Sequence, residues 1–201
     1  MKRQNPDQEL RDAVWVAHSL FERGKTAGSS ANLSIRAGDT VYITASGTCF
    51  GRLREEDLVP IGMDGKPLSD RKPSKEWPLH LALYEKSPEI GAVVHTHSSY
   101  SVLWSFAVGD EDRDCIPPHT PYLRMKLGSV GAVPYERPGS EALFAAFRAR
   151  VPSATVSFCG STGRWSRGPI SWRRSAIWRS WKRARALPGS FGERGCDPAR
   201  F

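Results

Sequence analysis

Two histidines spaced two residues apart close an apolar segment of the chain, Ala92-Val93-Val94-His95-Thr96-His97. Successive side chains of an extended strand point to opposite faces, so we expect His95 and His97 to leave the strand on the same side. Two imidazoles placed in this way can bind one metal ion. The spacing alone leaves a second interpretation open, in which both are core histidines with hydrogen-bond partners.

A hydroxyl, an ammonium group and a carboxylate stand together upstream, in Lys72-Pro73-Ser74-Lys75-Glu76, where we expect a helix to begin. A carboxylate of this kind can move protons, and a cation can hold an anionic group. Combined with the two histidines, this cluster indicates a divalent metal, an anionic substrate and an acid or base.

Two further segments, Gly28–Ile35 and Val41–Gly47, combine small hydroxylated residues with glycine and predict short strands joined through Ala37-Gly38-Asp39. Loops of this composition let backbone N–H groups approach an oxyanion, and phosphate is the usual occupant. The alternative is that they are ordinary turns, because serine and glycine are common in turns of every kind.

The elements that would position these groups alternate along the chain. Apolar periodicity and its stop signals predict helices over about 6–23, 74–86, 98–107 and 140–150, and strands over 28–35, 41–47, 90–95 and 131–134. Such alternation favours an α/β domain with a central sheet and helices on its faces. A chain of 201 residues is sufficient for one domain with a sizeable core.

The net charge of +8 would ordinarily indicate a nucleic acid or a membrane surface as partner. Residues 1–150 carry equal numbers of basic and acidic residues, however, so the whole excess lies in residues 151–201. We therefore expect neither partner. The four scattered cysteines, the absence of an apolar N-terminal segment and the absence of a long apolar run predict a cytoplasmic protein.

Six motifs follow one another over three quarters of the chain: Ser30-Ala31-Asn32-Leu33-Ser34, Thr44-Ala45-Ser46-Gly47, Lys72-Pro73-Ser74-Lys75-Glu76, Ala92-Val93-Val94-His95-Thr96-His97, Thr120-Pro121-Tyr122 and Val133-Pro134-Tyr135. In this order they resemble the class II aldolase family, which includes sugar-phosphate aldolases and the adducin head domain. The resemblance implies a class II aldolase-like single α/β domain over residues 1–150, with a central, mainly antiparallel β-sheet flanked by helices (αβα).

The resemblance also implies a site. His95 and His97 would be two of three histidine ligands to one divalent metal ion per subunit, with Zn2+ as the expected ion. Glu76 would stand beside the metal as acid/base or as an additional ligand. Phosphate and substrate would contact residues from three motifs, namely Ser29, Asn32, Ser46, Gly47, Ser74 and Lys75. Members of the family are commonly homotetramers.

Two side chains bear on the reaction. Lys75 occupies a place where the decarboxylase-like members carry lysine, and it could hold a substrate carboxylate; the alternative is a surface lysine. Tyr122 matches a position where a phenol can deliver a proton; the alternative is a packing aromatic. The expected reaction is metal-dependent decarboxylation of 3-oxo-tetronate 4-phosphate to dihydroxyacetone phosphate and carbon dioxide through an enediolate. A sugar-phosphate aldolase and an inactive adducin-like interaction domain are the alternatives.

Residues 151–201 depart from the family pattern. The third histidine belongs in a strand after the helix near 140–150, yet no histidine follows His119. The tail instead interleaves Arg with Trp, which taken literally would fit a nucleic-acid or membrane patch. We interpret it as a frameshifted remainder of the same domain, because GC-rich back-translation of Ser153–Ser166 read one base over gives Asp-Gly-Phe-Leu-Leu-Arg-Gln-His-Gly-Pro-Val-Val. Such a chain is expected to be unstable or nearly inactive.

Overall fold

The structure is a computed structural model that describes residues 6–97, 114–115, 121, 125, 130–150, 156–159 and 163–168. The helix predicted over 98–107 and Tyr122 lie outside these residues, as does most of the tail. The described elements are α1 (Pro6–Glu22), β1 (Asn32–Ala37), β2 (Thr40–Thr44), the short 3-10 helices η1 (Phe50–Arg52) and η2 (Glu55–Asp57), β3 (Leu58–Gly62), α2 (Trp77–Lys86), β4 (Ala92–Thr96), β5 (Val130–Val133), α5 (Glu141–Arg150), β6 (Val156–Cys159) and β7 (Gly163–Gly168).

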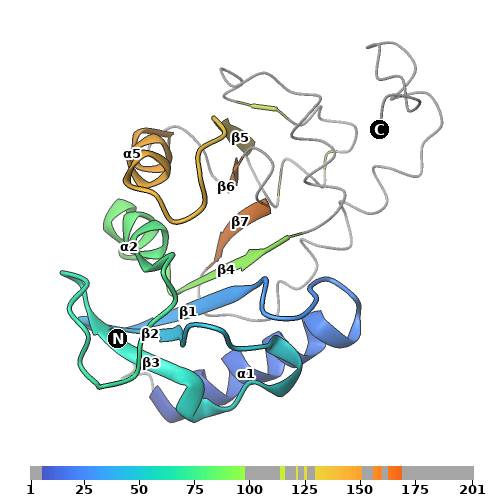
Figure 1. Cartoon of the computed structure of the whole chain (residues 1–201), viewed down its shortest axis with the longest axis vertical. Helices are drawn as coiled ribbons and strands as arrows, with labels where there is room; N and C mark the ends of the chain where they lie inside the picture. Colours follow the sequence, from blue (N-terminus) through green and yellow to red (C-terminus); the bar gives the residue numbers. More distant parts are fainter. Residues whose placement is uncertain are drawn as a thin grey trace.

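The described strands form one sheet in the order β3-β2-β1-β4-β7-β6-β5 (Figure 1). Every neighbouring pair is antiparallel except β5 and β6, which are parallel. The mainly antiparallel α/β sheet is therefore confirmed. Strand β3 was not predicted, because Pro60 interrupts its apolar run. A proline is tolerated there because β3 lies at the edge of the described sheet, where a missing N–H costs no ladder bond.

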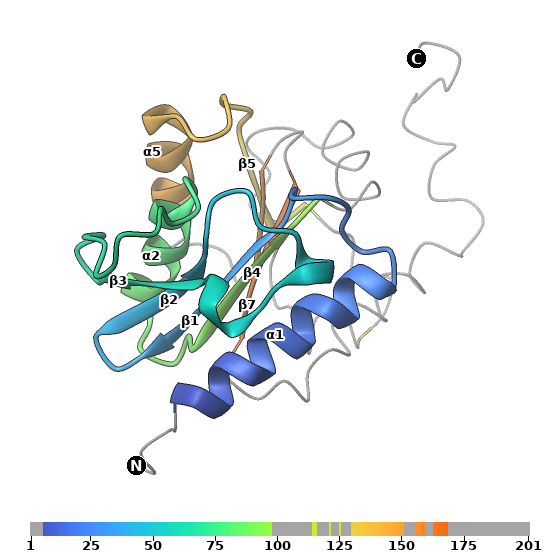
Figure 2. The ribbon, with the colours of Figure 1, turned by 60° about the horizontal axis from the view of Figure 1, so that its bottom comes forward.

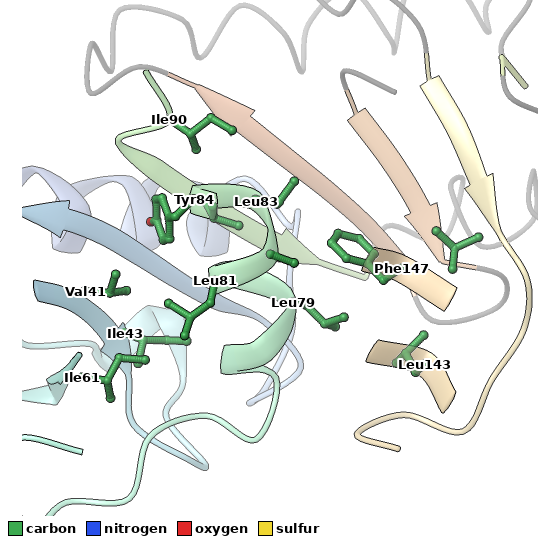
Figure 3. Close-up of a cluster of buried hydrophobic side chains, with 13 residues drawn as sticks. Val41, Ile43, Ile61, Leu79, Leu81, Leu83, Tyr84, Ile90, Leu143 and Phe147 are labelled. Carbon is green, nitrogen blue, oxygen red and sulfur yellow. The ribbon is translucent and has the colours of Figure 1, made fainter. Parts of the chain in front are cut away.

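Helices cover both faces of the sheet. Helix α1 lies on one side, whereas α2 and α5 stand together on the other (Figures 1 and 2). Each face has its own apolar cluster. Leu33 and Ile35 of β1 pack toward α1, while Val41 and Ile43 of β2 pack toward α2. The α2 and α5 side contains Leu79, Leu83, Tyr84, Leu143 and Phe147 (Figure 3).

Helix α2 begins later than predicted, at Trp77 rather than Ser74. The reason is tertiary. Pro73 forms a bridge with Ala45, and the Ser74 N–H donates to the Thr44 carbonyl at 2.9 Å, so this segment continues the sheet beyond the end of β2. Glu76 becomes the N-cap residue of α2 and is thereby held against the strand ends.

None of the helices in the described part of the chain is both long and apolar enough to span a bilayer. The helix predicted over 6–23 corresponds to α1, and the one predicted over 140–150 corresponds to α5. Proline at the start of α1 fits the fixed φ of a first helical residue, and Asp7 and Glu9 face the positive end of the helix dipole.

Candidate metal and phosphate site

The predicted site residues that the structure describes lie together at one end of the central strands. Strand β1 begins at Asn32, while β2 ends at Thr44 and β4 ends at Thr96. Because β1 runs antiparallel to both neighbours, its start lies beside their ends. The register places Asn32 directly opposite His95. The segment that leads into α2 is bonded to the end of β2 and brings Ser74, Lys75 and Glu76 to the same place.

His95 and His97 lie together, as their spacing predicts. Their ring centroids are 4.7 Å apart and their planes are inclined by 41°. Two imidazoles that bind one zinc ion through nitrogens at about 2.0–2.1 Å have centroids roughly 4.5–5.5 Å apart. Burial, together with the nearby His95, lowers the pKa of His97 to about 4. His97 is therefore neutral near pH 7, which is the state that binds a metal.

Glu76 is directed at His95 rather than into solvent. Its Oε2 accepts a hydrogen bond from Nδ2 of Asn32 at 2.7 Å and lies 2.8 Å from Nδ1 of His95. Burial alone raises the pKa of the Glu76 carboxyl, but the hydrogen bond from His95, the attraction of that imidazole and the bond from Asn32 together lower it to about 2. Glu76 is thus an ionised carboxylate with two donors on one oxygen.

His80 also belongs to this group of hydrogen-bonded side chains, although the sequence placed it only within the helix predicted over 74–86. Its side chain is completely buried, with Nε2 at 2.6 Å from Oδ1 of Asn32 and Nδ1 at 2.7 Å from Oγ of Ser34. Burial lowers its pKa to about 3, so it is neutral. The available signal was its position four residues after Glu76, which places both on neighbouring points of one helix.

A cavity of about 300 Å3 opens beside these groups. Every residue predicted to contact phosphate or substrate lines it, together with Glu76 and His97; the predicted set is Ser29, Asn32, Ser46, Gly47, Ser74 and Lys75. Gly47 has a φ of 80°, a left-handed conformation that lets the chain turn tightly behind Ser46. Thr48 and Pro138 also line the cavity and were not singled out from the sequence.

The ligand set is incomplete in the part of the chain that the structure describes. No three His, Cys, Asp or Glu side chains are arranged there to hold an ion. Two imidazoles at ligand spacing fit a divalent metal, but a catalytic zinc commonly has three protein ligands. The third histidine was expected in a strand after α5. Strand β7, which follows α5, pairs with β4 and places Trp165 opposite His95 and Arg164 opposite Thr96. Tyr122 lies outside the described residues, so its predicted role stays a prediction.

The profile of the Class II Aldolase and Adducin N-terminal domain matches residues 11–159. The chain belongs to this family. Class II aldolases depend on a metal ion, typically a divalent one.

Three proteins illustrate the similarity. The 3-oxo-tetronate 4-phosphate decarboxylase of Haemophilus influenzae is 43% identical over 128 residues, which are 63% of this chain and 61% of that protein. An L-fuculose phosphate aldolase from Methanococcus vannielii is 34% identical, over 63% of this chain and 68% of that protein. The crystal structure of YgbL from Klebsiella pneumoniae has a TM-score of 0.85 at 32% identity and covers 95% of this chain and 93% of its own. The chain thus matches less than two thirds of the length of that decarboxylase.

Proposed function

We propose that this scaffold serves the metal-dependent decarboxylation of 3-oxo-tetronate 4-phosphate to dihydroxyacetone phosphate and carbon dioxide. The observation that carries the proposal is the position of Lys75. It lines the same cavity as the serine and glycine loops, Glu76 and His97. A substrate with a phosphate at one end and a carboxylate at the other needs two anion-binding regions on either side of its ketone, and the cavity offers both.

His95 and His97 are the proposed protein ligands of one ion per subunit, with Zn2+ as the proposed metal. Imidazole nitrogens suit zinc, and the neutral state of His97 supports the choice. When bound, a divalent ion polarises a ketone and stabilises the charge that develops on its oxygen. Glu76 as a further ligand stays a prediction; in this structure its Oε2 bonds Asn32 and His95.

The side chains of the cavity would bind and orient the substrate. Backbone N–H groups and hydroxyls around Ser29, Ser46 and Ser74 can surround a phosphate, and the left-handed Gly47 leaves room for its oxygens. The Lys75 ammonium would hold the carboxylate that is lost. When both ends of the substrate are held, the carbon–carbon bond to the carboxylate keeps one orientation relative to the ketone. This lowers the entropy cost of the reaction.

The bond changes balance without an oxidant. The carbon–carbon bond to the carboxylate breaks, carbon dioxide leaves, and the electron pair moves toward the ketone oxygen. The carbon that lost the carboxylate then takes up a proton. Glu76, ionised with a pKa of about 2, would accept a proton from a substrate hydroxyl and shuttle it. Tyr122 is the second proposed proton donor.

Aldol cleavage of a sugar phosphate is the second candidate, supported by the similarity to the L-fuculose phosphate aldolase. It passes through the same kind of enediolate, and only the bond that breaks differs. A carboxylate clamp has no use in that reaction, so Lys75 separates the two candidates. In an inactive adducin-like interaction domain, neither chemistry would occur and no metal would be retained.

We also propose that residues 151–201 are a frameshifted remainder and that the third imidazole is lost with them. The protein would then act in the cytoplasm as a homotetramer only in its restored form, with a phosphorylated sugar acid as its small-molecule partner. In the chain as it stands, two histidines would hold zinc loosely and turnover would be near zero.

The test compares this chain with a version in which one restored base returns the Gln-His-Gly-Pro strand. Both are supplied with Zn2+ and 3-oxo-tetronate 4-phosphate, and release of carbon dioxide and dihydroxyacetone phosphate is followed. We expect turnover from the restored chain and almost none from the present one. Full activity of the present chain would overturn the incomplete-site proposal, and cleavage of L-fuculose 1-phosphate without decarboxylation would favour the aldolase. Resequencing that finds the reading frame intact would remove the frameshift.

A further inference from the structure

A line of hydrogen bonds runs from the site into the core between β1 and α2. It passes from Glu76 to Asn32 at 2.7 Å, from Asn32 to His80 at 2.6 Å, from His80 to Ser34 at 2.7 Å and from Ser34 to the Tyr84 hydroxyl at 2.7 Å. All five side chains are buried. Neither Ser34 nor Tyr84 lines the cavity, so neither can touch a substrate there.

The donors and acceptors of this line can be assigned from its Glu76 end. At the site end, the ionised Glu76 can only accept, so Asn32 turns its Nδ2 toward Glu76 and its Oδ1 toward His80. His80 must then donate from Nε2, which leaves Nδ1 as an acceptor for the Ser34 hydroxyl. Ser34, having donated, accepts from the Tyr84 hydroxyl.

The same logic fixes His95. Its Nδ1 lies 2.8 Å from Glu76 Oε2 and 3.4 Å from Asn32 Nδ2. A short contact with a carboxylate outweighs a long one with an amide, because the charge-assisted bond is about twice as strong. Nδ1 therefore carries the proton, and the lone pair of the ring is at Nε2. A carboxylate that orients the distal nitrogen of a ligating histidine is a common arrangement around zinc.

We propose that Ser34, His80 and Tyr84 are positioning residues. Their hydrogen bonds, which all run in one direction, hold Asn32 and Glu76 in place. Glu76 in turn keeps the lone pair of His95 at Nε2, where a divalent metal binds. The metal half of this statement rests on the proposed function; the protonation pattern does not. If Ser34 no longer donates to Nδ1, the His80 ring loses one of the two bonds that hold it and can turn away from Asn32. Asn32 can then rotate its amide, and Glu76 loses a fixed donor.

The experiment measures the side-chain nitrogen shifts of the five histidines by two-bond 1H–15N NMR on the metal-free full chain, which distinguishes the two neutral tautomers. We expect His80 with its proton on Nε2 and His95 with its proton on Nδ1. The opposite tautomer at either ring in the unsubstituted protein would overturn the proposal without reference to metal or activity.

Variants then test the line itself. Ser34→Ala should loosen the His80 ring, give mixed tautomers there and weaken zinc binding, by less than the roughly 10–100-fold that loss of a direct hydrogen-bond partner of a metal ligand costs. Tyr84→Phe, in which Ser34 can still donate, should have a smaller effect, and His80→Gln should retain more affinity than His80→Leu because an amide can donate and accept along the same line. Affinity is measured by competition with a chromophoric chelator, and folding by circular dichroism.

Thr26→Val is the matched control, because it removes a buried hydroxyl that lies outside the line. It should change neither tautomers nor zinc affinity. If folded Ser34→Ala and Tyr84→Phe both keep the original tautomers and the original affinity, the line has no positioning role. If the tautomers change while zinc binding is absent in every protein, including the unsubstituted one, the proposed metal site fails and the hydrogen-bond assignment stands.

Discussion

The two halves of the sheet differ in what they contribute to the site. Strands β1, β2 and β4, with the segment before α2, supply the pair of imidazoles, the carboxylate, the amide and the serine and glycine loops that line the cavity. Strands β5, β6 and β7 complete the sheet, yet their sequences contain no histidine. Strand β7 pairs with β4 over five residue pairs, from Ala92↔Gly168 to Thr96↔Arg164.

This contrast separates two requirements of a functional fold. Pairing in a sheet uses backbone N–H and C=O groups, which nearly every residue type has. A metal site needs particular side chains at particular register positions. A segment of altered sequence can therefore continue the sheet while it fails to deliver a ligand, and four predictions test this division.

The largest effect is expected in the half of the sheet that contains β1, β2 and β4. His95→Ala and His97→Ala should each abolish measurable zinc retention, because a single remaining imidazole cannot fix the ion. Competition with a chromophoric chelator, which also detects the loose binding expected of the unsubstituted chain, checks this. His18→Ala is the control, since His18 contacts the Leu53 carbonyl away from the site. Unchanged zinc in either substituted protein would remove the ligand assignment.

Glu76→Gln should lower turnover of the restored chain by about 10²–10⁴-fold, because an amide keeps the shape of the carboxylate but cannot accept a proton. Phosphate binding, followed by calorimetry, should be retained, since the amide does not alter the serine and glycine loops. Rates near those of the unsubstituted enzyme would assign Glu76 a structural role alone.

Lys75→Ser should weaken decarboxylation by about 10–100-fold, the loss expected for a charge-assisted bond of about 1.5–3 kcal/mol. An analogue without the carboxylate should bind almost as before. The ratio of the two losses is the measurement, because equal losses would mean that Lys75 does not hold the carboxylate. The neighbouring exposed Lys72→Ser serves as a charge-matched control.

The smallest effect concerns acid stability. The pKa of His80 is lowered to about 3 from an ordinary value of 6.5, so between these values the unfolded chain binds a proton that the folded chain excludes. His80 therefore makes the folded state lose stability as the pH falls from about 6.5 toward 3. Urea unfolding at pH 7 and pH 5 should show a smaller decrease for His80→Gln than for the unsubstituted chain. An equal decrease would mean that other groups control acid unfolding.

Local signals in the sequence were sufficient for much of the fold. Proline at the first helical position and the apolar spacing after it predicted α1, and Gly139-Ser140 predicted the start of α5. The late start of α2 was missed, because the bond from Ser74 N–H to Thr44 joins segments thirty residues apart. Strand β3 was missed because it contains Pro60, and proline is tolerated only in the edge strands of a sheet. Which strand lies at the edge is known only once all the strands are placed.

For the site, spacing alone determined that His95 and His97 share a side of the chain, because the alternation of a strand is a local property of the backbone. The motifs identified the cavity residues, and their order identified the family. Tertiary structure decided which polar groups meet. Asn32 contacts Glu76 across 44 positions of the chain and His80 across 48. Such contacts follow from strand register and helix packing, which are set by burial over the whole sheet and not by any one segment.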